Sequence, residues 1–501
     1  SGSNGLAGPG NAGAEKAGPD NAETAAARRK PNIVFIHTDD LSANLAPYMA
    51  AVRKMRRTGT TFANHFVADS LCCPSRAAML TGRFPHNTRV LTNKNTSGGG
   101  NRAFVRHGNA KRTYAVRLNR AGYRTGLLGK YLNGYGIKRK VPPGWDEWHV
   151  AGKGGYNNMP GKYEITGVEH RGDRKHITHP KKYLTDLIGA RARGLISRAR
   201  KQHQPFFLQL SSFATHSRVG RGVGPLFPPA PRDRPGAQFK HGDCGVKGGK
   251  RVNCGNLHVK RGTGFSKRVY RKLDVDLRNR VRMAQSVNDQ IRKIRKHLNR
   301  AELRRTYFVF SSDNGFHLGD HGLKRGKGSA YDHDSRVPLV VTGPGVRRGK
   351  VRGEIVQNID LHATFLRMAR AKRRPNDGHS LKGLLEGDSG KAWRDAALLE
   401  HKHHRPNAGS GFEPDDDGDV AAKARGRFNP SSHTYRALRT KRWLYVSYAS
   451  GRKELYDLRS DAGQNHNVYR SHRKLVRTKL QPALRALHRC DGAGCWKAGH
   501  L

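Results

Sequence analysis

The strongest constraint on the fold is a repeated alternation of short apolar runs with longer amphipathic stretches. The first run, Asn32 to His37, ends in Thr38-Asp39-Asp40, which is the pattern of a buried strand with polar residues at its carboxyl end. Helical spacing of apolar residues follows near 112–121 and again over 273–299. Strands alternating with helices predict an α/β sandwich around a mostly parallel sheet, flanked by helices. Further runs of this kind occupy 205–210, 307–310 and 337–341.

The pattern changes at both ends of the chain. Residues 1–30 are dominated by Gly, Ala, Asn and Pro without an apolar period, so we expect a flexible N-terminal tail. From about residue 390 the strands become shorter, at 443–446 and 454–456, and a basic helix follows near 472–489. We therefore predict a main domain over 31–388 and a smaller C-terminal α+β domain over 389–501.

The charge of the chain limits the classes of molecule that it is expected to bind. The sequence has 501 residues with 95 Lys and Arg against 38 Asp and Glu, which gives a formal net charge of +57. This balance excludes an ordinary near-neutral cytosolic enzyme and favours polyanionic partners, with nucleic acid bound at most nonspecifically. Hydrophobic residues still make up 35%, enough to bury a core, and no apolar run is long enough to predict a membrane-spanning helix.

The six cysteines fall into three close pairs. Two pairs, Cys244 with Cys254 and Cys490 with Cys495, enclose short polar loops, and we expect both to form disulfides, as in exported proteins. Ser1 begins no signal peptide, so an exported protein would be the mature form, secreted to an extracellular or periplasmic space, or lysosomal in a eukaryote. Cys72 and Cys73 are adjacent, which is a rare arrangement for a disulfide, so this pair requires another explanation.

Residues 71–83 carry the most informative motif, Leu-Cys-Cys-Pro-Ser-Arg-Ala-Ala-Met-Leu-Thr-Gly-Arg. Proline early in a helix and the following Ala-Ala-Met-Leu place Cys72 at a helix N-terminus, where anions are favoured, with Arg76 one turn further on. From Cys72 onwards this segment resembles the Cys-x-Pro-Ser-Arg-x-x-x-Leu-Thr-Gly motif of the type I sulfatases at every fixed position. The resemblance implies an alkaline-phosphatase-like fold for the predicted main domain, which would then be catalytic.

In that family the motif cysteine is oxidised by a formylglycine-generating enzyme, and the resemblance implies formylglycine at Cys72. One hydroxyl of the hydrated aldehyde would attack sulfur, and the other would expel sulfate afterwards by collapse to the aldehyde. Arg76 would then be a catalytic cation. Three further segments resemble family motifs that bear catalytic and sulfate-binding residues, namely 122–131 with Lys130, 212–217 with His216 and 326–331 with Lys327.

Oxygen donors follow two of the predicted strands. Asp39 and Asp40 come after the first run, and Asp313 and Asn314 come after the run at 307–310. Carboxyl ends of parallel strands share one edge of a sheet, so these side chains could converge beside Cys72. An all-oxygen set suits Ca²⁺ or Mg²⁺ and not zinc. In the family that this chain resembles, these positions and the formylglycine at Cys72 hold one Ca²⁺.

The residues after Lys130 depart from many arylsulfatases, which have a histidine two positions after this lysine. Here that position is Leu132, and Asn133 is a candidate to replace part of the histidine's role. This Gly-Lys-Tyr-Leu-Asn form resembles the branch of N-acetylglucosamine-6-sulfatases and heparan endosulfatases. His317, in an Asp-Asn-Gly-x-His segment, is expected at the edge of the site to contact substrate.

The resemblance thus predicts a secreted sulfatase acting on sulfated glucosamine-containing glycans or other sulfated polysaccharides. Two alternatives stay open at this point. One is a phosphonate or phosphate ester hydrolase of the same superfamily, because such enzymes share the Cys-x-Pro-Ser-Arg motif. The other is a catalytically dead protein that only binds polyanions, for which Cys72 would remain an unmodified thiol.

Overall fold

The computed structural model describes residues 29–96, 98–152, 154–169, 174–178, 180–218, 225–233, 246–247, 250–251, 257–261, 265–390, 392–403 and 428–501. Both Cys244 and Cys254 lie outside these residues, as does most of the predicted N-terminal tail. Residues Pro31–Leu501 form one compact unit.

The unit is organised around a ten-stranded sheet in the order β12-β2-β11-β10-β1-β7-β3-β4-β5-β6. The five central strands β10, β1, β7, β3 and β4 are parallel to one another. This confirms the predicted α/β sandwich. In chain order the strands are β1 (Asn32–Thr38), β2 (Thr60–Phe66), β3 (Arg124–Gly129), β4 (Glu147–Ala151), β5 (Glu164–Val168), β6 (Arg174–Thr178), β7 (Phe206–Ser211), β10 (Thr306–Ser312), β11 (Leu339–Thr342) and β12 (Lys350–Gln357). Strands β8 (Val246–Lys247) and β9 (Lys250–Arg251) form a separate hairpin.

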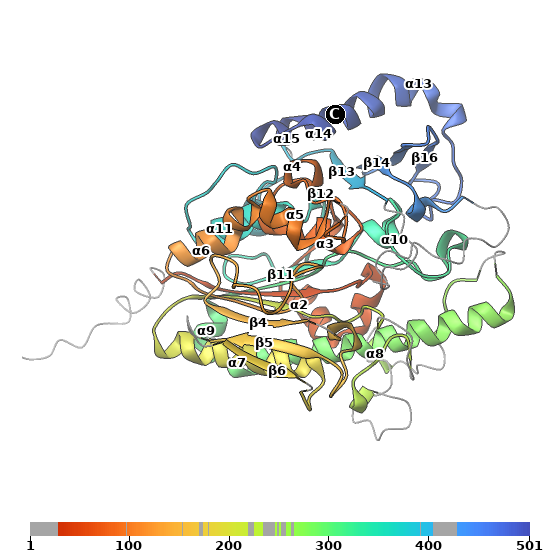
Figure 1. Cartoon of the computed structure of the whole chain (residues 1–501). Coiled ribbons are helices and arrows are strands. Elements are labelled where there is room, and N and C mark those ends of the chain that lie inside the picture. The colour runs from red at the N-terminus through yellow and green to blue at the C-terminus, as the bar shows by residue number, and fades with distance from the viewer. Residues whose placement is uncertain are drawn as a thin grey trace, which may run out of the picture. The chain divides into compact units, whose positions relative to one another are not determined.

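Helices cover both faces of the sheet (Figure 1). Strand β1 explains this arrangement. Its alternate side chains point to opposite faces of the sheet and pack into two different hydrophobic cores. Ile33 and Phe35 pack in a cluster with residues of α3, α6 and α11, whereas Val34 and Ile36 pack in a cluster with residues of α2, α7 and α8. The helices of this part are α2 (Ala50–Thr58), α3 (Cys72–Thr81), α4 (Pro85–Thr88), α5 (Gly100–Arg106), α6 (Tyr114–Arg120), α7 (Leu184–Lys201), α8 (Lys267–His297), α9 (Arg300–Arg304), α10 (Asp332–Ser335), α11 (Asp360–Met368) and α12 (Lys382–Glu386).

Two elements differ from the sequence-based expectation. Helix α8 begins at Lys267, earlier than 273, because Ser266 caps it by accepting a hydrogen bond from the Val269 amide. The run at 337–341 becomes strand β11, which is antiparallel to both β10 and β2. No helix between β10 and β11 spans the length of the sheet, so the chain turns back at the same edge instead of crossing over.

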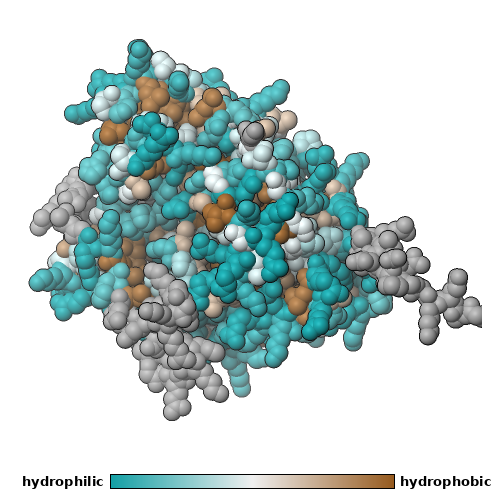
Figure 2. Space-filling model, turned by 180° about the vertical axis from the view of Figure 1, so that it is seen from behind, coloured by the Kyte–Doolittle hydropathy of each residue, from teal (hydrophilic) through white to brown (hydrophobic). Residues whose placement is uncertain are grey.

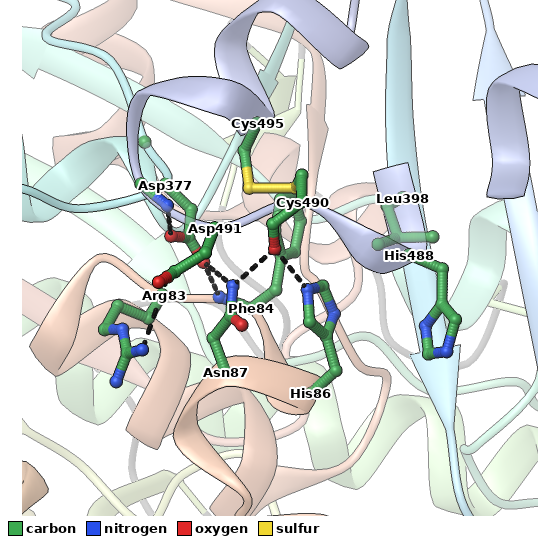
Figure 3. Close-up of a disulfide and its surroundings, with 12 residues drawn as sticks. Arg83, Phe84, His86, Asn87, Asp377, Leu398, His488, Cys490, Asp491 and Cys495 are labelled. Carbon is green, nitrogen blue, oxygen red and sulfur yellow. Dashed lines mark hydrogen bonds and ion pairs between the residues drawn. A yellow bond between two sulfur atoms is a disulfide. The ribbon is translucent and has the colours of Figure 1, made fainter. Parts of the chain in front are cut away.

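A second, four-stranded antiparallel sheet forms the predicted smaller C-terminal domain. Its core contains Leu398, Leu438, Tyr445 and Leu455, packed against the last helices of the chain. The Cys490–Cys495 disulfide is present as predicted and closes the turn between two of these helices (Figure 3). The elements are β13 (Ala396–His401), β14 (Tyr435–Thr440), β15 (Trp443–Tyr448), β16 (Lys453–Asp457), α13 (Arg473–Leu475), a π-helical turn (Val476–Leu480), α14 (Gln481–Arg489) and α15 (Ala493–Ala498).

The surface agrees with the charge of the sequence. On the face shown in Figure 2, hydrophilic residues dominate and apolar residues are scattered between them. Within the described ranges, no helix is both long enough and apolar enough to cross a bilayer.

Candidate active site

The carboxyl ends of four parallel strands meet at one place. Thr38 pairs with Ser312, His37 pairs with Ser211, and Gly129 also pairs with Ser211. The residues that follow these strand ends therefore lie side by side, although they are far apart in sequence. They include Asp39, Asp40, Lys130, His216, Asp313 and Asn314.

Cys72 is the first residue of helix α3, and Leu71 is the extended N-cap before it. Pro74 fits the first turn because no amide hydrogen is needed there for the helical ladder. The helix ends at Gly82, whose φ of 70° is left-handed and whose amide donates to the Ala78 carbonyl at 2.8 Å. The fully buried Cys72 side chain thus lies at a helix N-terminus, where unpaired amides and the helix dipole favour an anion.

Lys327 and Asp39 contact the sulfur of Cys72, and each also contacts a residue of opposite charge. Lys327 Nζ lies 2.9 Å from Cys72 Sγ and 2.7 Å from Asp40 Oδ1. Asp39 Oδ1 accepts a hydrogen bond from Cys72 Sγ at 3.4 Å, and its Oδ2 lies 2.7 Å from Lys130 Nζ. Burial, followed by repulsion from Asp313, raises the pKa of Asp39 to about 6.

Arg76 links three of these strand ends. Its Nε donates to Asp313 Oδ2 at 2.7 Å, and its Nη1 donates to Ser211 Oγ at 2.8 Å and to the Lys130 carbonyl at 3.1 Å. Burial alone would raise the pKa of Asp313, but attraction to Arg76 and Lys130 outweighs it and holds this pKa well below its ordinary value. Asp313 is therefore ionised, and Arg76 stays a fixed cation one turn after Cys72.

His216 faces both the carboxylates and an aromatic ring. Its Nε2 lies 3.5 Å from Asp40 Oδ2, and its Nδ1 lies 2.7 Å from the Ser217 carbonyl. Tyr156 packs against His216 with the ring centroids 4.5 Å apart, and Lys130 Nζ lies 4.8 Å from the centroid of the same ring. Asn133 Nδ2 donates to the Tyr156 hydroxyl at 3.1 Å. Asn133 therefore joins the site through Tyr156.

His317 reaches the site through its backbone. Its amide and carbonyl pair with those of Gly326, which precedes Lys327. Its side chain points to Asp334, with Nδ1 3.0 Å from Oδ2. In this structure the visible effect of His317 is to place the segment that carries Lys327, while its contact with substrate stays a prediction.

Three residues that contact the site were not predicted from the sequence. Tyr156 lies in a short 3₁₀ turn (Gly155–Asn157) that carries no periodic signal. Arg280 is a buried arginine of α8 that donates to the Asp40 carbonyl and lies 4.3 Å from the centroid of the Phe316 ring. Ser211 is the last residue of β7, and its position at a strand end is the one signal that could have revealed it.

The donor set at these strand ends fits a metal ion. The ligand atoms of Asp39, Asp40, Cys72 and His216 all lie within 4.8 Å of one another. Asn314 Oδ1 is buried and accepts no hydrogen bond from the described residues, whereas its Nδ2 donates to Asp40 Oδ1 at 2.7 Å. Carboxylate and amide oxygens are the ligands that hard cations prefer. Asp313 Oδ1 accepts hydrogen bonds from the backbone amides of Asp40 and Asn314, at 3.2 and 2.8 Å, and so helps to position these two residues.

Comparison with known proteins gives a consistent result. The Sulfatase family model matches residues 31–371. The chain is 28% identical to N-acetylglucosamine-6-sulfatase from Homo sapiens over 95% of this chain and 87% of that protein. It is 32% identical to the extracellular sulfatase SULF-1 homolog from Drosophila melanogaster over 76% of this chain and 34% of that protein. A solved structure of a protein in complex with its substrate D-glucosamine-2-N,6-O-disulfate has a TM-score of 0.68, 21% identity and coverage of 91% of this chain and 97% of that one.

Proposed function

The chain belongs to the sulfatase family of sulfuric ester hydrolases, and we propose that it hydrolyses sulfate esters on sulfated glucosamine-containing glycans, with a formylglycine derived from Cys72 as nucleophile. The observation that carries this proposal is the position of Cys72. Its side chain is buried at the start of α3, with Lys327 Nζ 2.9 Å from the sulfur and Asp39 Oδ1 3.4 Å from it.

The cations around Cys72 suit a sulfuryl group. Arg76, Lys130 and Lys327 are all nearly fully buried. Their charges are therefore already in place and are not screened by water, so they would neutralise negative charge on the transferred group. Formylglycine supplies a hydrated aldehyde with one hydroxyl for attack and one for release. Asp39, Asp40, Asp313 and Asn314, with residue 72, would hold Ca²⁺, which supplies a Lewis acid that favours the ionised nucleophile.

His216 is placed to move a proton. The Ser217 carbonyl accepts from Nδ1–H, which leaves Nε2 on the side of the Asp40 carboxylate at 3.5 Å. His216 could therefore protonate the leaving alcohol as the ester bond breaks, with Lys327 as the second donor near the same carboxylate.

Two observations support the glucosamine-sulfate class of substrate. The name of the human relative specifies a 6-sulfate on N-acetylglucosamine, and the match to it extends over 95% of this chain. The Leu132-Asn133 pair replaces the histidine of many arylsulfatases, and Asn133 is tied to Tyr156 beside Lys130 and His216. A net charge of +57 would attract a sulfated polymer, and secretion would bring the enzyme to such a polymer.

Peptide mass spectrometry across residues 71–83, after native expression, tests the nucleophile. We expect the mass of formylglycine at position 72. A thiol at this position in protein that still hydrolyses sulfate esters would overturn the mechanism, and a thiol in protein without activity would favour a polyanion-binding role.

A second assay separates the ester classes. Rates on matched nitrophenyl sulfate and nitrophenyl phosphonate esters should favour the sulfate. A faster phosphonate reaction would assign the site to the alternative hydrolase function. Among sulfated sugars, we expect release of sulfate from glucosamine 6-sulfate units and no release from galactose sulfates.

A further inference from the structure

A second cluster of metal-ligating side chains lies outside the active site. His86 of α4, Glu400 of β13 and His488 of α14 bring their ligand atoms within 4.8 Å of one another. His86 Nδ1 lies 2.7 Å from Glu400 Oε2, and His488 Nδ1 lies 2.5 Å from Glu400 Oε1. Figure 3 shows both histidines close to the Cys490–Cys495 disulfide.

The hydrogen bonds of His86 leave one ring nitrogen for a cation. Its Nε2 lies 2.9 Å from the Cys490 carbonyl oxygen, which can only accept, so Nε2 carries a hydrogen (Figure 3). A neutral imidazole then has its lone pair on Nδ1, directed at a Glu400 oxygen that also has only lone pairs. This contact is attractive only when a proton or a metal ion binds Nδ1. A carbonyl that fixes the distal nitrogen is the usual support of a metal-bound histidine.

The surroundings allow a metal ion to enter and stay. Glu400 is 7% exposed, so its charge is shielded from water, whereas both imidazoles are partly exposed. His488 also lines a cavity of about 440 Å³ between β14, β15 and α14, which provides a route from solvent. Two imidazole nitrogens and one carboxylate oxygen are a common protein ligand set for zinc, unlike the oxygen-rich set beside Cys72.

We propose that His86, Glu400 and His488 bind a divalent transition-metal ion, Zn²⁺, at a site separate from the active site. Nδ1 of each histidine and one Glu400 oxygen are the ligands, and water entering from the cavity completes the coordination. When zinc binds, any proton on Nδ1 passes to solvent, and the charge of Glu400 is neutralised by the metal instead of by an imidazolium.

This site would join the C-terminal helices to the end of the nucleophile helix. Only residues 82–84 separate α3 from α4, which carries His86. The same turn is held by Asp377, whose Oδ2 accepts from the Phe84 amide and from Asn87 Nδ2 and whose Oδ1 accepts from the Gly492 amide (Figure 3). Zinc would therefore stabilise the packing of α14 against this turn, and its binding would raise the thermal stability of the folded chain.

The test uses the untagged full-length chain, stripped of transition metals and kept in saturating Ca²⁺. Zinc is titrated in competition with a chromophoric chelator, and Co²⁺ serves as a spectroscopic substitute. We expect one tight equivalent, with affinity reduced more than about 10-fold in His86→Gln and in His488→Gln. His466→Gln, at an exposed histidine outside the cluster, is the matched control and should bind like wild type.

Melting temperatures and the remaining variants test whether zinc binds at this cluster. Zinc should raise the melting temperature of wild type and of His466→Gln, and not that of His488→Gln. If folded wild type binds no zinc under these conditions, the proposal fails without reference to any variant. Loss of binding in Asp40→Asn but not in His488→Gln would place the zinc in the active site and overturn the proposal. None of these measurements depends on catalysis. They would therefore give the same answer even if the chain did not hydrolyse sulfate esters.

Discussion

The Lys327 ammonium lies 2.9 Å from the sulfur of Cys72, although 255 residues separate the two in sequence. Lys327 also contacts Asp40 Oδ1 at 2.7 Å, so its position is fixed by an ion pair on the other side. A buried cation held this close to residue 72 is suited to stabilise negative charge in the reaction.

Replacing Lys327 by methionine should therefore lower kcat by about 100-fold or more, because a preorganised cation is lost where charge develops. Steady-state kinetics on a nitrophenyl sulfate measures the effect. Lys350→Met, at an exposed lysine that begins β12, is the matched control and should leave kcat unchanged. Equal kinetics for both variants would remove Lys327 from catalysis.

His216→Ala should lower turnover most for esters with poor leaving groups. The imidazole lies beside the Asp40 carboxylate, and a proton donor matters more as the leaving alcohol becomes more basic. A series of substituted phenyl sulfates gives the dependence of log kcat on leaving-group pKa, and we expect a steeper slope for the variant. Parallel lines for variant and wild type would contradict a general-acid role.

Tyr156 contacts Lys130 and His216 through its ring and Asn133 through its hydroxyl. Tyr156→Phe keeps the ring, so we expect a loss of less than about tenfold in kcat/KM. Tyr156→Ala removes the ring against which the Lys130 ammonium and the His216 imidazole pack, so we expect a larger loss. Equal effects of the two substitutions would show that only the hydroxyl matters.

Removal of the hard cation should abolish activity reversibly. We expect a chelator selective for Ca²⁺ to inactivate the enzyme and added Ca²⁺ to restore it. Asn314→Ala should raise the Ca²⁺ concentration needed for half-maximal activity, because a buried amide oxygen is lost. Full activity in demonstrably metal-free protein would refute the metal assignment.

Buried His362 predicts how stability depends on pH. Burial lowers its pKa from 6.5 to about 4, although its Nδ1 bonds the Leu80 carbonyl. Below pH 6.5 the unfolded chain takes up a proton that the folded chain does not, so stability falls from pH 6.5 down to about 4. The full loss is about 3 kcal/mol.

Urea unfolding at pH 7 and pH 5, compared between wild type and variant, measures the part of this loss that falls between the two pH values. His362→Leu should show a smaller difference between the two pH values than wild type. His466→Leu, at an exposed histidine, should match wild type. An unchanged pH dependence in His362→Leu would exclude His362 as the source.

The sequence determined the parts of this protein that depend on local pattern. Apolar runs such as Asn32 to His37 predicted buried strands, and a proline-containing segment with Ala-Ala-Met-Leu predicted Cys72 at a helix start. Short-range chemistry also revealed the Cys490–Cys495 disulfide, because its loop is closed within six residues.

Tertiary structure decided what meets across the chain. Tyr156 and Arg280 lie at the site because their elements pack beside the strand ends, and no local pattern marks such packing. The antiparallel direction of β11 and the cluster of His86, Glu400 and His488 likewise depend on long-range contacts. Side chains brought together by the packing of distant elements leave no periodic trace in the sequence, so only the folded chain shows them.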